Sequence, residues 1–143
     1  MSPNIYNILL VEDSAGPSTI KEAVARVQGF RIVSHVPDAL AAVAYIRGQG
    51  KSADRERFPL PDILLLDLNA PRCADMEFVH WTQRRVLRPV LAAFSSLKRP
   101  EDSKLAEELQ ADLYEADISD ANVFNRFLHF AGNIADLKRR GSI

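Results

Sequence analysis

Two short, continuous apolar runs dominate the hydrophobic pattern of this chain. Ile8–Val11 and Ile63–Leu66 each consist of large aliphatic residues with no polar residue between them. Uninterrupted runs of this kind are typical of strands buried on both faces of a parallel sheet. Glu12 and Asp13 follow the first run, and Asp67 follows the second. The chain thus places carboxylates at the ends of its two most apolar predicted strands.

The rest of the pattern alternates between predicted strands and predicted helices. The strands are expected at Asn4–Val11, Phe30–Val36, Asp62–Leu66, Val90–Phe94 and Leu113–Glu115. The helices are expected from Pro17 to Gly29, from Pro37-Asp38 to Arg47, from Asp75 to Arg85, from Pro100 to Leu109, and onward from an N-cap at Ser119. The polar segment from Gly48 to Pro61 is expected to form a loop.

This alternation predicts an α/β fold, a doubly wound parallel sheet of five strands with helices on both faces. In the strand order 2-1-3-4-5, the first and third strands are neighbours where the order reverses, and ligands of such sheets bind beyond the carboxyl ends there. Glu12, Asp13 and Asp67 all lie at those ends. Three like charges in one crevice repel each other unless a cation neutralises them, and Mg²⁺ is a hard cation that prefers oxygen ligands. The pattern therefore predicts a magnesium site.

Composition narrows the functional class. A chain of 143 residues fits one domain, 1–143, and a net charge of -1 gives no overall attraction to nucleic acid or an anionic membrane. The basic cluster Lys138–Arg140 has no interleaved aromatic residues and is expected to be the solvated end of the last helix. The single cysteine, Cys73, excludes an intrachain disulfide and is expected to be a passive thiol. No run approaches the roughly 20 residues of a membrane span, so the cytoplasm is the expected location.

The chain resembles the receiver domains of two-component response regulators over nearly its whole length. The matching segments are Ile8–Asp13, Pro61–Asn69, Pro71 and Pro89-Val90. The stretch from Asp38 to Asp67 is most similar to single-domain receivers that partner bacterial phytochrome kinases. The resemblance implies a flavodoxin-like receiver fold with a signalling function and no enzymatic one. It also implies a histidine kinase of the phytochrome type, a downstream protein partner and, by analogy, a homodimer.

The resemblance assigns roles to individual residues. Asp67 matches the aspartate that accepts a phosphoryl group from the kinase. Glu12 and Asp13 match the pair that binds Mg²⁺ together with Asp67, and Asn69 matches the position whose backbone carbonyl completes the metal shell. Ser95 matches the hydroxyl that contacts the phosphoryl group, and this assignment is preferred over Phe94 because Val90–Phe94 then fills the strand. Tyr114 matches the aromatic residue that turns inward when that hydroxyl moves.

Two departures from the family weaken the match. The family has a lysine at the end of the fifth strand, where this chain has Asp117, so an attraction for the phosphoryl group is expected to become a repulsion. The family also has Asp-Gly in the turn after its proline, where this chain has Ala74-Asp75, so Asp75 would have to accept a positive φ.

Several alternative functions stay open or are excluded by these residues. The main alternative is a pseudo-receiver that is not phosphorylated and acts as a protein-interaction adaptor. A haloacid-dehalogenase-type phosphatase would need an acid where Asn69 lies, and Glu12-Asp13 would repel the phosphate of a flavodoxin-type cofactor. His35, His80 and His129 share no metal-ligand spacing and are expected to be surface or packing residues.

Overall fold

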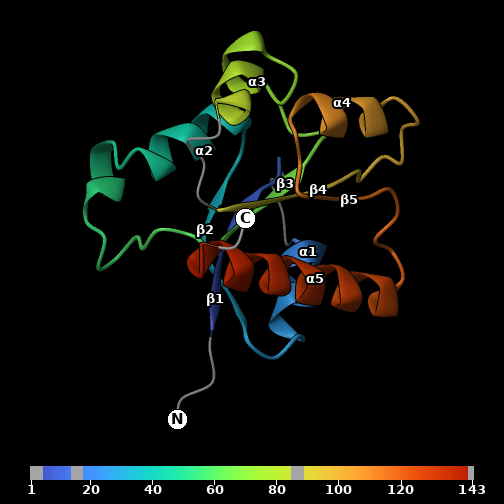
Figure 1. Ribbon diagram of the computed structural model, residues 1–143, viewed down its shortest axis with the longest axis horizontal. Coiled ribbons are helices and arrows are strands. Elements are labelled where there is room, and N and C mark those ends of the chain that lie inside the picture. The colour runs from blue at the N-terminus through green and yellow to red at the C-terminus, as the bar shows by residue number, and fades with distance from the viewer. Residues whose placement is uncertain (1–4, 14–17, 85–88, 142–143) are drawn as a thin grey trace.

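The computed structural model describes residues 5–13, 18–84 and 89–141, which form one parallel sheet with helices on both sides (Figure 1). The strands are β1 (Tyr6–Val11), β2 (Phe30–Val36), β3 (Ile63–Asp67), β4 (Val90–Phe94) and β5 (Leu113–Glu115). The helices are α1 (Thr19–Ala25), α2 (Ala39–Ile46), α3 (Met76–Gln83), α4 (Asp102–Glu108) and α5 (Ala121–Arg139). The strand order is β2-β1-β3-β4-β5, and every pairing is parallel. The predicted fold class and strand order are confirmed.

The two apolar runs form the centre of the sheet, as the sequence predicts. β1 pairs with β3 from Ile8↔Ile63 to Val11↔Leu66. All residues of β3 and β4 are buried, and β1 is buried from Ile8 onward. Because successive side chains of a strand point to opposite faces, continuous apolar runs supply both layers of the core.

Two separate cores lie on the two faces of the sheet. On one face, alternate strand residues such as Leu9 and Leu64 pack against α2, α3 and α4. On the other face, the intervening residues such as Leu10 and Leu65 pack against α1 and α5. Figure 1 shows the same division, with α2 to α4 above the sheet and α1 and α5 below it.

Several element boundaries differ from the predictions. Gly50–Ala53 forms a short 3-10 helix within the expected loop. The first helix ends at Ala25, before Gly29. The N-cap of α5 is Asp120, whose carboxylate accepts from Asn122 N and Val123 N, and Ser119 donates to Asp117 instead. An aspartate one position later therefore replaces the predicted serine cap. The predicted boundaries at residues 4, 17 and 85 lie outside the described residues.

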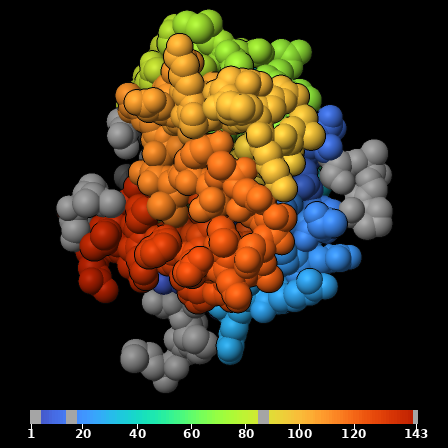
Figure 2. All heavy atoms as spheres, turned by 90° about the vertical axis from the view of Figure 1, so that its right-hand side faces the viewer, coloured from blue at the N-terminus to red at the C-terminus, as the bar shows by residue number. Residues whose placement is uncertain are grey.

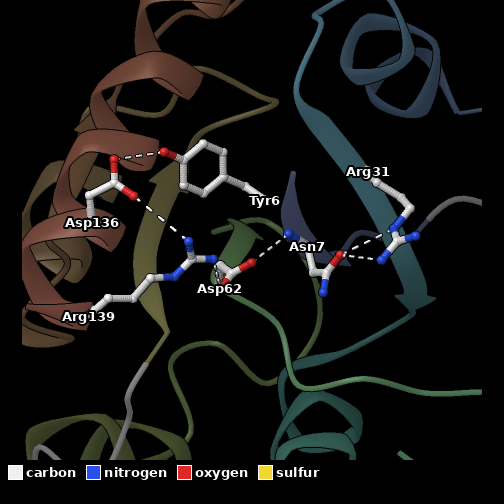
Figure 3. Close-up of polar contacts among 6 residues, drawn as sticks. All are labelled: Tyr6, Asn7, Arg31, Asp62, Asp136 and Arg139. Carbon is white, nitrogen blue, oxygen red and sulfur yellow. Dashed lines mark hydrogen bonds and ion pairs between the residues drawn. The ribbon is translucent and has the colours of Figure 1, made fainter. Parts of the chain in front are cut away.

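The C-terminal end of α5 contacts the amino-terminal ends of the strands, opposite the strand ends that carry Glu12 and Asp67. Figure 3 shows the contacts of Arg139. Arg139 pairs with Asp62 at 2.6 Å, and Lys138 pairs with Asp112 at 3.1 Å. Asp62 and Asp112 also accept the backbone N–H groups of Asn7 and Leu91. The basic cluster lies at the end of the last helix, as predicted, with Arg139 and Arg140 exposed, and the structure adds that Lys138 and Arg139 pair with two acids just before strands.

Within the described part of the chain, no helix combines the length and apolar character that crossing a membrane requires.

Candidate functional site

The candidate site lies at the carboxyl ends of β1, β3 and β4. Val11 pairs with Leu66, so Glu12 and Asp67 are the next residues at two adjoining strand ends. Asp67 itself pairs with Phe94, the last residue of β4. The expectation that the two apolar strands are neighbours is therefore confirmed, and the sheet brings the backbones of Glu12 and Asp67 to the same edge.

Asp67 is a buried carboxylate, and backbone N–H groups of two loops donate to one of its oxygens. It is 5% exposed, and its Oδ1 accepts from Asn69 N at 2.9 Å and from Ser96 N at 3.4 Å. Its backbone carbonyl accepts from Ala70 N at 3.0 Å and from the Cys73 thiol at 3.4 Å. Within the described residues no donor binds Oδ2. The loops after β3 and β4 thus fix the carboxylate through Oδ1.

The two acids after β1 have different surroundings. The Glu12 carboxylate accepts a hydrogen bond from the Ser18 hydroxyl and lies 3.9 Å from His35 Nε2. His35 Nε2 also lies 2.8 Å from the Glu12 carbonyl oxygen. Asp13 is exposed. Among the described residues, no group of three His, Cys, Asp or Glu side chains is placed to hold a metal ion. The expected gathering of the three carboxylates around one cation stays a prediction, and the Glu12 carboxylate is held by Ser18 with His35 nearby.

The donor set still fits a hard divalent cation in its chemistry. Glu12, Asp13 and Asp67 offer carboxylate oxygens, and the loop at Asn69 offers a backbone carbonyl, which are the ligand types that Mg²⁺ and Mn²⁺ bind. Ser18 donates to Oε1 of Glu12, so the other carboxylate oxygen of Glu12 could join such a site while this hydrogen bond is kept. The metal assignment to these four residues stays a prediction.

The loop after β4 contains the largest departure from the sequence-based expectations. Ser95 directly follows β4 and is 2% exposed, and its hydroxyl donates to Asp102 Oδ2 at 2.6 Å. The Asn69 amide donates to the same oxygen at 2.7 Å. Asn69 Oδ1 in turn accepts from Leu97 N at 2.8 Å. Asp102, which the sequence marks only as an acid in a first helical turn, is 4% exposed.

We call Asp102, Ser95 and Asn69 the Asp102 cluster. Sequence reasoning missed it because Asp102 follows Pro100 and Glu101, a context that is typical of a solvated helix start. The one available signal was the short spacing between Ser95 and Asp102, which lets a loop fold back so that the two side chains meet.

Tyr114 lies in β5 opposite Ala93 and packs at the edge of the core on the α2–α4 face. Burial raises the pKa of its hydroxyl, and the nearby Asp102 carboxylate raises that pKa further. Asp102 is therefore close to both residues, Ser95 and Tyr114, that were assigned to the switch.

Asp117 is less repulsive than the sequence suggests. It is exposed, and its carboxylate accepts from Ser119 N at 2.9 Å and from the Ser119 hydroxyl at 2.6 Å. Lys98 Nζ lies 3.4 Å from Asp117 Oδ2. These Ser119 hydrogen bonds, and then Lys98, lower the pKa of Asp117. A cation from the loop after β4 thus partly neutralises the acid that the sequence resemblance matches to the family's lysine.

The turn after β3 corrects another expectation. The residue with a positive φ is Arg72, at 70°, whereas Asp75 has a φ of -63° and is the N-cap of α3. The strained position therefore lies three residues before the one that the family pattern indicates.

Cys73 is buried, and burial, followed by the nearby Asp67 carboxylate, raises the pKa of its thiol to about 12. A passive thiol is consistent with that direction.

Comparisons with known proteins place this geometry in context. No protein-family model matches the sequence. The response regulator Rcp1 from Synechocystis sp. is 38% identical over 69 residues, which cover 46% of this chain and 43% of Rcp1. The match therefore spans less than half of that relative.

Solved structures extend the likeness to most of the chain. The phosphorylated cyanobacterial phytochrome response regulator RcpA matches with a TM-score of 0.63 and 25% identity, over 93% of each chain. The Mn²⁺-bound form of Rcp1 matches with a TM-score of 0.61 and 25% identity, over 89% of this chain and 90% of that chain. In fold, and in part of its sequence, this chain is similar to response regulator receiver domains, including phytochrome-associated ones.

Proposed function

We propose that this chain is a receiver domain of two-component signalling that accepts a phosphoryl group on Asp67 from a histidine kinase. The observation that carries the proposal is the place of Asp67. It is a buried carboxylate at the end of β3, where the strand order reverses, with Oδ1 held by backbone N–H groups. Ligand sites of doubly wound sheets lie at that point. The similarity to Rcp1 and RcpA supports both the phosphoacceptor role and a kinase of the phytochrome type.

The chemistry needs one free carboxylate oxygen in line with the donor. Asp67 Oδ2 would attack the phosphorus atom, the new O–P bond forms as the bond to the kinase histidine breaks, and the histidine nitrogen leaves with that electron pair. A divalent cation, when bound, neutralises the carboxylates and the incoming phosphoryl oxygens. Glu12, Asp13, Asp67 and the carbonyl of Asn69 are the residues that would hold it. The Mn²⁺-bound form of Rcp1 supports a divalent cation, and we propose Mg²⁺.

The output of such a switch would be a change in a protein-binding surface. Ser95 directly follows β4 and Tyr114 lies in β5, next to α4 and α5, so a shift of the Ser95 hydroxyl would reach that side of the molecule. Figure 2 shows this face, with the yellow and orange segment from the end of β4 to β5 above the orange-red atoms of α5. We propose that a downstream protein, or a second copy of the chain, binds there, and that residues 1–143 form one receiver domain that acts in signalling without catalysing a reaction of its own.

A second candidate function is a pseudo-receiver that binds a partner without phosphorylation. Three observations favour it. Asp117 occupies the position of the family's lysine, Ser18 holds the Glu12 carboxylate, and Asp102 holds the Ser95 hydroxyl. The charge of Asp117 and the hold of Asp102 on Ser95 would have to be overcome before a phosphoryl group could be bound in the family's manner, and Ser18 restrains the Glu12 carboxylate.

One experiment separates the two candidates. The protein is incubated with acetyl phosphate or phosphoramidate and Mg²⁺ and separated on a phosphate-affinity gel, beside Asp67→Asn and the matched control Asp75→Asn. A retarded band that is lost in Asp67→Asn and kept in Asp75→Asn supports phosphorylation of Asp67. If no donor and no divalent metal gives a retarded band in the wild-type protein, the adaptor function is the better account.

A further inference from the structure

Asp102 is a buried carboxylate whose described partners are neutral groups. It begins α4 and is 4% exposed, and both of its hydrogen bonds, from Ser95 Oγ and Asn69 Nδ2, reach Oδ2. No Lys, Arg or His of the described residues forms an ion pair with it. A buried acid usually retains its hydrogen bonds because losing one leaves the charge poorly compensated. The two donors are therefore held firmly.

Ser95 has no second hydrogen to offer. Its hydroxyl donates to Asp102 at 2.6 Å, lies at a longer 3.4 Å from the acceptor Asn69 Oδ1, and accepts from Arg99 N at 3.2 Å. A serine hydroxyl carries one hydrogen, so the same group cannot donate to Asp102 and to a phosphoryl oxygen at once. Any phosphoryl group on Asp67 that is to bind Ser95 must take that hydrogen from Asp102.

We propose that Asp102 is a positioning residue that holds Ser95 in a resting orientation, so that a phosphoryl group on Asp67 competes with Asp102 for the Ser95 hydrogen. This inference rests on the proposed function and concerns the regulation of the same site. Asp102 thereby sets how strong a signal the switch requires. A hydrogen bond to a charged acceptor is strong enough for the competition to weaken binding of a phosphoryl analogue by about tenfold.

The Asp102 cluster also connects the site to the loop after β4. Asn69 bridges Asp102 to the loop after β4, because its Oδ1 accepts from Leu97 N and from the Ser96 hydroxyl. Leu97 is an exposed apolar residue on that loop. Ser95 Oγ lies 3.4 Å from the same Asn69 Oδ1, so a shift of Ser95 would also act on this bridge and on the loop that carries Leu97.

The test uses beryllofluoride with Mg²⁺ as a phosphoryl analogue and measures its dissociation constant by calorimetry. The variants are Asp102→Asn and the matched control Glu101→Gln, which removes the same charge from the neighbouring exposed position. Asp102→Asn should bind about tenfold more tightly than Glu101→Gln, because the neutral amide is a weaker competitor for Ser95. In a Ser95→Ala background, Asp102→Asn should change the affinity no more than Glu101→Gln does. Equal affinities for Asp102→Asn and Glu101→Gln would overturn the proposal.

A second measurement needs no phosphoryl analogue. Amide hydrogen exchange at Leu97 and Arg99 should be faster in Asp102→Asn and in Ser95→Ala than in Glu101→Gln. If beryllofluoride binds no variant, including the wild type, the proposed function fails, and exchange alone decides whether Asp102 holds Ser95. Unchanged exchange in both variants contradicts that role. If Asp102→Asn does not fold, Ser95→Ala breaks the same hydrogen bond and keeps the test decisive.

Discussion

At the scale of single residues, the sequence predicts where the backbone of a residue lies better than it predicts which groups its side chain contacts. Asp67 could be placed from the sequence because the carboxyl ends of all strands in a parallel sheet lie at the same end of the sheet. Asp102 could not, since its burial depends on a loop that folds back to bring Ser95 against it. Glu12 shows the same limit. Its backbone lies where expected, but its side chain contacts Ser18 and His35, and no regular helix or strand spacing in the sequence predicts these contacts.

Cys73 carries a prediction about alkaline pH. Its folded-state pKa of about 12 lies above the ordinary value of 9.0, so the unfolded chain loses the thiol proton first. The stability that the neutral thiol contributes is complete below about pH 9 and is lost as the pH rises toward 12. Between pH 8 and pH 10, urea unfolding of the wild type should therefore lose about 1 kcal/mol more than Cys73→Ala does.

A thiol reagent gives the kinetic counterpart of that test. At pH 8 a disulfide reagent such as dithionitrobenzoate should label Cys73 slowly in the folded protein and rapidly in urea, because the thiolate is the reactive form. Fast labelling of the folded protein would contradict a buried, passive thiol.

Asp117 carries a prediction about the response to a phosphoryl analogue. Asp117→Lys removes an acid that pairs with Lys98 and restores the charge that the family has at this place. The variant should bind beryllofluoride with Mg²⁺ more tightly than the wild type, whereas Asp120→Asn, an equally exposed acid nearby, should bind it as the wild type does. Calorimetry measures both affinities. An unchanged affinity in Asp117→Lys would mean that position 117 does not face the phosphoryl site.

At the scale of elements, strands were predicted more accurately than helix ends. β2, β4 and β5 begin and end as expected, because their apolar residues are fixed by the pairing of the sheet. Helix ends depend on which of several adjacent polar residues forms the cap. Ser119 and Asp120 both suit an N-cap, and only the hydrogen bonds of the folded chain show that Asp120 caps α5 while Ser119 serves Asp117.

The contact between α5 and the sheet carries a prediction about stability. The Asp62 side chain is 20% exposed and accepts from both Asn7 N and Arg139, as Figure 3 shows. Asp62→Ala leaves the Asn7 N–H without its acceptor and removes one of the ion pairs that hold the end of α5, so unfolding should cost about 2 kcal/mol less. Asp75→Ala is the control. Its ion pair with Arg72 is between exposed side chains, so the change should be below about 0.5 kcal/mol.

Urea unfolding followed by circular dichroism measures both changes. Equal, small losses for Asp62→Ala and Asp75→Ala would show that the end of α5 contributes little to holding the sheet edge, despite its ion pairs.

At the scale of the whole molecule, topology follows from the pattern because few arrangements bury two uninterrupted apolar strands. Helices on both faces are needed to cover β1 and β3, and right-handed crossovers then leave few strand orders. What topology does not supply is the distribution of stability. β3 and β4 are buried throughout, whereas β5 has three residues, all half-buried, at the edge of the sheet. The candidate switch thus lies on the least anchored side.

Hydrogen exchange across the molecule should follow this gradient. Amides of β1, β3 and β4 should exchange slowest, since their hydrogen bonds open only when both cores come apart, and β5 should exchange faster because one edge is unpaired. Beryllofluoride with Mg²⁺ should then change the exchange rates of β5 and of the loop after β4. The exchange rates at the end of α5 that contacts Asp62, at the opposite end of the strands, should stay the same. Mass spectrometry of the exchanged peptides resolves these segments. If β5 proved as protected as β3 with no analogue bound, the sheet would be uniformly stable. A switch that displaces Tyr114 would then have to overcome the free energy of unfolding of the whole domain. A single new hydrogen bond at Ser95 is too weak to do this.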